Sequence, residues 1–191
     1  MYSTALYVHL LAVAGAFFCM GMMLVSMLQV HAATRVSDAL RFAATTEKTA
    51  KIMPLATVLL LLTGGYMALD RWSWSAAWVD LSLAGLLIVT FFGAGVLGSR
   101  ERGLHKALSA AQSENLDGAL EAQVRSPFLV AGSGLNAGLV CAVMYVMVAK
   151  PDWAGGIVAL VLGAIAGYAV FSSTARRAIA SAPALAAPSR P

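Results

Sequence analysis

Long apolar stretches, separated by short segments that hold most of the charges, make up the chain. A helix needs roughly 20 mostly apolar residues to cross a membrane, and five stretches reach or approach that length. The predicted spans are residues 4–30, 52–70, 76–99, 127–149 and 153–175. Because lipid offers no water to unpaired backbone groups, each span is expected to be an α-helix. We therefore predict an all-α membrane bundle of five spans, with a four-helix core and one additional helix.

The segments between the spans have weaker patterns of their own. Residues 1–177 form one predicted membrane domain, and residues 178–191 form an Ala- and Pro-rich tail. Within 100–126, apolar residues recur at helical spacing on both sides of a break at 115–118. This pattern predicts two short amphipathic helices, which lie at the inner interface or dock on a partner. Residues 36–43 have a fainter pattern, typical of a continued first helix or of a solvated connector.

Composition supports a membrane protein, and the positions of the charges predict its orientation. Apolar residues make up 60% of the 191 positions and charged residues only 12%, too few for a soluble surface. The net charge of +4 is not a nucleic-acid patch, because the basic residues mark one side of the membrane. By the positive-inside rule, the N-terminus is expected outside and the C-terminus in the cytoplasm. The basic residues on the inner side are Arg35, Arg41, Lys48, Lys51, Arg100, Arg102, Lys106, Arg125, Arg176, Arg177 and Arg190, against Arg71 and Lys150 outside.

Glycines inside the predicted spans indicate close helix packing. Small residues four apart let two membrane helices approach each other closely. Gly134 and Gly138 have this spacing in the fourth span, and Gly163 and Gly167 have it in the fifth. The run 93–98 matches a dinucleotide fingerprint by letter, but it lies inside a span and not after a strand. We therefore interpret Gly93 as a packing residue too.

Four polar residues are predicted to lie at one level in the outer half of the membrane. His9 lies roughly 9 Å below the outer surface, and the other three are Tyr66, Asp80 and Tyr145. Ionisable groups at this depth are costly unless they are paired, so they are candidates for a functional site. Three interpretations stay open: a structural His9–Asp80 hydrogen bond, a ligand or cofactor contact at His9, and no contact at all.

Metal and redox chemistry have little support in the sequence. Cys19 and Cys141 lie at different depths, which disfavours a disulfide or a shared metal, and both are expected to be buried packing residues. Methionines around Cys19 would suit Cu(I) but are more often packing residues. His9 and His31 are about 33 Å apart on one helix and cannot share a haem iron. No complete catalytic constellation is present, so an enzyme is not expected.

Three segments carry a resemblance to a known family. They are Tyr7-Val-His9-Leu-Leu-Ala-Val-Ala-Gly15, the second span from Pro54 to Tyr66, and Met147-Val-Ala-Lys150-Pro151. Together they resemble a bacterial family of predicted integral membrane proteins of unknown function, which is distantly similar to the CopD and HemJ groups. These groups are linked to copper handling and haem biosynthesis, so the resemblance implies that His9 is a haem or copper ligand. The intramembrane lysine of HemJ-like proteins has no counterpart in these spans.

These observations lead to three hypotheses about function. The first is a non-catalytic accessory or structural subunit of a larger inner-membrane complex, in contact with lipids and with other subunits or a second copy. The second is a membrane protein that binds haem or copper through His9. The third is a small oligomeric transporter, although few polar residues are available to line a path. Bound lipids are expected, and a haem b is not.

Overall fold

The computed structural model describes residues 1–71 and 76–181, and the described chain is almost entirely helical. Five helical stretches in it are long and apolar enough to cross a membrane, as predicted. The five that cover the predicted spans are α1 (Tyr2–Ala32), α3 (Met53–Arg71), α4 (Ala77–Thr90) with η1 (Phe91–Leu97), α7 (Pro127–Ala149) and α8 (Trp153–Ser181). Since α8 ends at Ser181, the first residues of the predicted tail are helical, and the remainder of the tail lies outside the described residues.

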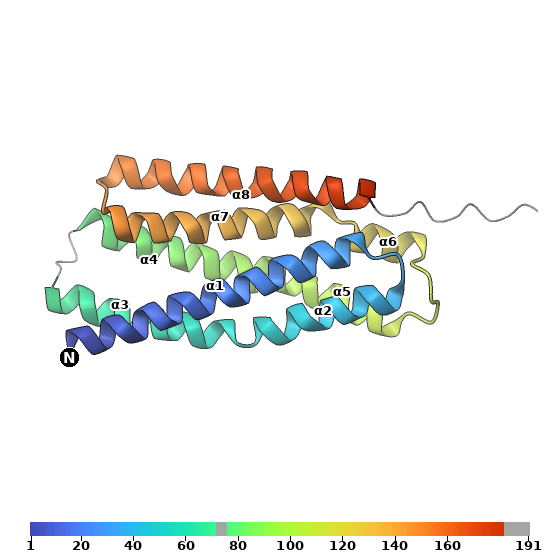
Figure 1. Ribbon diagram of the computed structural model, residues 1–191, viewed down its shortest axis with the longest axis horizontal. Helices are drawn as coiled ribbons and strands as arrows, with labels where there is room; N and C mark the ends of the chain where they lie inside the picture. Colours follow the sequence, from blue (N-terminus) through green and yellow to red (C-terminus); the bar gives the residue numbers. More distant parts are fainter. Residues whose placement is uncertain (72–75, 182–191) are drawn as a thin grey trace, which may run out of the picture.

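The spans lie side by side along one long axis (Figure 1). Helix α1 packs mainly on α2 and α3, and α4 packs mainly on α7 and α8. Helix α8 packs along α7 at one edge of the bundle (Figure 1). The N-terminus and the α7–α8 turn lie at the same end, which we call the N-terminal end. The arrangement agrees with a four-helix core and one additional helix.

The opposite end is built from the segments between the spans, where helices lie on both sides of the predicted break at 115–118 but the connections differ from two expectations. Helix α1 does not continue outward, because it ends at Ala32 and α2 (Val36–Ala50) runs back alongside it. Helix α5 (Gly98–Ala110) continues directly from η1 and is not a separate interfacial helix. The short α6 (Gly118–Val124) follows the predicted break, and Asp117 caps it by accepting a hydrogen bond from the Leu120 amide at 2.9 Å.

The apolar faces of these segments are buried against one another and against the end of α1. We call α2, α5 and α6 together the helical cap. Its amphipathic faces are therefore occupied within the chain, in place of the interfacial or partner contacts that their pattern predicted. The buried core of the cap includes Val30, Ala39, Leu104, Leu108, Leu120 and Val124.

Polar contacts connect the cap to α1. His31 is only 3% exposed, and its Nδ1 lies 3.1 Å from the Val124 carbonyl oxygen, to which it donates. The Val36 amide donates to the Glu114 carbonyl at 3.0 Å, which holds the turn between α1 and α2. The turn is thus fixed by a segment almost eighty positions further along the chain.

A charged cluster joins α2 to α5 on the surface of the cap. Glu47 contacts Lys51 at 3.0 Å and His105 Nδ1 at 3.0 Å. The hydrogen bond from Lys51 is the main reason that the pKa of Glu47 is lower than its ordinary value, and the positive charges nearby act in the same direction.

Helices α7 and α8 make the closest helix contact in the bundle, and Gly134, Gly138, Gly163 and Gly167 lie in it. A methyl group at Gly138 would overlap the Gly163 carbonyl and would lie 3.0 Å from the Gly167 Cα atom. A methyl group at Gly134 would lie 2.6 Å from the Gly167 carbonyl oxygen. The two backbones therefore approach each other at positions where no Cβ atom fits.

Gly93 packs in a different way, inside η1, a π-helix of seven residues. A methyl group at Gly93 would lie 2.9 Å from Asn136 Nδ2 of α7. The Oδ1 atom of Asn136 is buried and has no hydrogen-bond partner among the described residues. The widened turn and the missing side chain together make room for the amide of Asn136 between the two helices.

Candidate functional site

A cavity of about 610 Å³ lies between α1, α3, α4 and α7, in the half of the bundle nearer the N-terminal end. Its volume is within the usual range of small-molecule sites, about 300–1,000 Å³. The lining is mainly aliphatic and aromatic, and His9 and Ser82 are the polar side chains that line it below its rim. A mostly apolar hollow with few polar groups is typical of a site for an apolar ligand.

His9 on α1 is 8% exposed and is held by α3. Its Nδ1 lies 2.9 Å from Thr63 Oγ1. The Thr63 hydroxyl donates its proton to the Leu59 carbonyl of its own helix, so it accepts from His9. In the neutral ring the proton therefore sits on Nδ1, and Nε2 carries a lone pair.

Cε1 and Nδ1 are the ring atoms of His9 that lie nearest to Gly64 of α3. Gly64 makes room for the imidazole, because a methyl group there would lie 3.4 Å from His9 Cε1 and 3.8 Å from Nδ1. Nε2 is farther than 4 Å from that point. Nδ1 is therefore bonded to Thr63 of α3, and Nε2 is the nitrogen left for a ligand in the cavity.

Ser82 on α4 is the second polar side chain of the cavity wall. It is 3% exposed, and its Oγ has no hydrogen-bond partner among the described residues. Burying a hydroxyl without a partner costs about 1–3 kcal/mol, so such a group calls for an explanation.

The rim of the cavity at the N-terminal end contains Tyr2, Trp78 and Lys150. The Lys150 ammonium lies 5.2 Å from the centre of the Trp78 ring, within the range of a cation–π contact. Lys150 ends α7 in the left-handed conformation, with φ 50°, which turns the chain towards α8. The rim therefore combines aromatic rings with a positive charge above an apolar interior.

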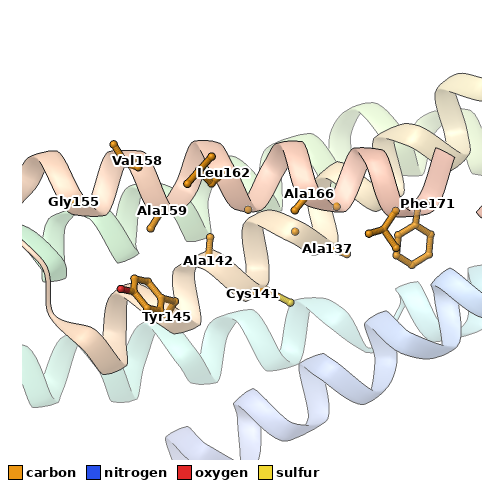
Figure 2. A pocket seen from close by; sticks show the side chains of 14 residues that line it. Ala137, Cys141, Ala142, Tyr145, Gly155, Val158, Ala159, Leu162, Ala166 and Phe171 are labelled. Atoms are coloured by element: carbon orange, nitrogen blue, oxygen red, sulfur yellow. The ribbon is translucent and has the colours of Figure 1, made fainter. Parts of the chain in front are cut away.

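The four residues predicted to share one polar layer do not converge. Only His9 lines the cavity, and its hydrogen bond goes to Thr63 and not to Asp80. Tyr66 and Tyr145 are 40% and 56% exposed and face away from the bundle interior. Tyr145 lies instead at the groove between α7 and α8 (Figure 2).

Two of the residues that define the site, Thr63 and Ser82, were missed by sequence reasoning. A weak signal existed for each, because Thr63 precedes the Gly64-Gly65 pair opposite His9 and Ser82 lies two residues after Asp80. Serine and threonine are common in membrane helices, so neither position is distinctive without the fold.

The cysteines do not form a metal site. Both are free, Cys19 is buried as expected, and Cys141 is exposed on α7, contrary to expectation. The described residues contain no group of three or more His, Cys, Asp or Glu side chains that would hold a metal ion. A metal bound in the cavity would depend on His9 and on ligands from a cofactor.

Five membrane-spanning helices with a buried polar site define a multi-pass integral membrane protein. A family model described as "Predicted integral membrane protein (DUF2269)" matches residues 4–151, and the chain belongs to that family. The match includes the four helices that surround the cavity and ends before α8. No curated protein matches the chain, and no solved structure matches it.

Proposed function

We propose that the protein binds a small molecule dissolved in the membrane, and that His9 is the main polar contact of this ligand. The observation that carries the proposal is the His9 imidazole, whose Nδ1 is occupied by Thr63 while Nε2 is left for the cavity. With the predicted orientation, the cavity lies in the outer half of a bacterial inner membrane.

The test is to identify what copurifies with the protein. After purification in a mild detergent and organic extraction, mass spectrometry should detect one class of apolar molecule in stoichiometric amount. A His9→Leu variant should lose that molecule, and a Val13→Phe variant should exclude it, because Val13 lines the cavity. A Tyr145→Phe variant should retain it, since Tyr145 lies outside the cavity. Equal retention by the His9 variant would overturn the proposal.

Haem or copper is a special form of this ligand. A neutral imidazole nitrogen facing a cavity is a suitable axial ligand for haem iron and suits copper as well. An absorption spectrum and a metal analysis of the purified protein test this form directly. A Soret band lost in His9→Leu supports it. A colourless, metal-free protein that still holds an organic ligand contradicts it and leaves the broader proposal standing.

A second candidate is an accessory subunit of a larger membrane complex, and the groove between α7 and α8 favours it. The groove lies on the outside of the bundle and is lined mainly by small residues, which allow another helix to approach closely (Figure 2). Its lining includes Ala137, Gly138, Cys141, Ala142, Ala159 and Ala166.

The exposed Cys141 thiol in this groove provides the test, because Cys19 is buried. A benzophenone maleimide attached to Cys141 in native membranes should crosslink to another protein chain on illumination. The matched control carries the label at Leu62→Cys, a lipid-exposed position on α3, in a Cys141→Ser background. Lipid adducts alone at both positions would contradict a subunit at the groove.

A further inference from the structure

Two hydroxyl side chains of the described helices, Ser82 and Ser172, are buried with no hydrogen-bond partner, and of these two Ser82 lines the cavity. Most of the others donate to a carbonyl three or four residues earlier in their own helix, which satisfies them without any partner. Thr63 and Thr90 do so at Leu59 and Leu86. Ser82 makes no such bond, although it is nearly completely buried and lines the cavity. Its Oγ–H is thus available to a molecule inside the cavity.

His9 and Ser82 belong to opposite walls of the cavity. Helix α1 packs mainly on α2 and α3, whereas α4 packs mainly on α7 and α8, so the cavity separates α1 from α4. His9 lies about 10 Å below the start of α1 and Ser82 about 7 Å below the start of α4, at 1.5 Å per residue. The two polar groups therefore face a ligand from two sides at a similar depth.

The hydrogen-bonding roles of these groups restrict the ligand. His9 Nε2 accepts, so it needs a hydroxyl or another donor, and Ser82 Oγ–H donates to an oxygen. We infer that the ligand, whose binding is the proposed function, is a lipid-soluble quinol: an apolar ring with oxygens on opposite edges. One hydroxyl donates to His9, and the opposite oxygen accepts from Ser82.

The remaining length of the cavity suits a hydrocarbon tail. Residues of α1 from Tyr2 to Phe17 line the cavity, which corresponds to about 22 Å along the helix axis. Beyond the level of Ser82 its walls include Leu86, Val89 and Val140, none of which offers a hydrogen bond. A ring at the level of His9 and Ser82 therefore leaves apolar space for a prenyl or alkyl chain.

The test measures binding of decylubiquinol and decylubiquinone to the full-length protein in lipid nanodiscs, by titration calorimetry under argon. The quinol should bind about tenfold more tightly than the quinone, because only the quinol has a hydroxyl for His9. His9→Leu should remove this preference. Ser82→Ala should weaken both forms about tenfold, since Ser82 donates to either oxygen. Thr90→Val, on the same helix but outside the cavity, should change neither affinity.

Palmitic acid, a long-chain probe with no ring, distinguishes a failure of the quinol inference from a failure of the proposed function. If palmitic acid binds in a manner that depends on His9 and neither decylubiquinol nor decylubiquinone binds, the quinol inference is overturned and the proposed function stands. Equal affinity for the quinol and the quinone, or a Ser82→Ala variant that binds both normally, also overturns the inference. If no probe binds and nothing copurifies, both fail.

Discussion

The contact between α7 and α8 allows a sharp prediction about the stability of the bundle. At Gly138 an added methyl group would overlap the Gly163 carbonyl, and it would lie 2.9 Å from the Gly163 carbonyl carbon and 3.0 Å from the Gly167 Cα atom. Carbon atoms in contact prefer about 3.5–4.0 Å. All three obstacles are backbone atoms, so no side-chain rotation relieves the overlap, and α8 must move away by more than about half an ångström.

The Gly138→Ala substitution should therefore destabilise the protein. Overpacking costs about 1–3 kcal/mol, and the better helix propensity of alanine returns up to about 1 kcal/mol. The net loss expected in the free energy of unfolding is therefore up to about 2 kcal/mol, and the difference from a control that gains only helix propensity is about 1–3 kcal/mol. Gly15→Ala is the matched control, because a methyl group at Gly15 meets nothing within 4 Å. That control should be neutral or slightly stabilising.

Unfolding by sodium dodecyl sulfate in mixed micelles, followed by tryptophan fluorescence, measures both variants against the unmodified protein. The decisive quantity is the difference between the two substitutions and not either value alone, because both make the same chemical change in a membrane helix. If Gly138→Ala and Gly15→Ala shift the free energy of unfolding equally, the close approach of the two backbones is refuted.

Three further predictions concern the helical cap and the orientation of the chain. Leu108 is 1% exposed, so Leu108→Ala should cost about 2–5 kcal/mol, read out as a lower thermal midpoint in detergent; an unchanged midpoint would show that the cap core is not packed. Because Lys51 lowers the pKa of Glu47, the pair stabilises the cap above the ordinary Glu pKa of 4.5 and loses that contribution as pH falls below it. A Glu47→Gln variant should flatten this part of the pH–stability curve, and an unchanged curve would count against the pair. In a cysteine-free background, an impermeant maleimide should label Ser3→Cys in intact cells and Ser113→Cys only after permeabilisation, and the reverse pattern would contradict an outside N-terminus.

The membrane part of the fold could be predicted from the sequence because lipid imposes simple requirements on length and polarity. Apolar length alone gave the five spans, and the short turn at 150–152 gave the α7–α8 hairpin. The glycines were informative because their spacing places them on one helix face. The fold-back of α2 was not predictable in this way, since the segment Ala33-Thr34-Arg35 contains neither glycine nor proline. The turn is held instead by Glu114, a tertiary contact.

For the candidate site, the sequence predicts how deep a side chain lies in the membrane but not the direction in which it points. Counting residues along a helix gives the depth of a side chain in the membrane, and His9 was found in this way. Counting does not give the direction, because each residue turns the side chain by about 100°. Tyr66 and Tyr145 were expected to join His9 but face away from the bundle interior. Thr63 instead contacts His9, and Ser82 lines the cavity. Only the packed bundle fixes which polar groups meet.

The position of α7 in the chain has a consequence for the order in which the protein is made. Three walls of the cavity come from the first half of the chain, and α7 supplies the fourth through residues such as Val143 and Met147. During synthesis, the first three spans enter the membrane with one side of the hollow still open to lipid. The hollow therefore takes its final form only when α7 is inserted, after its other three walls are already in the membrane.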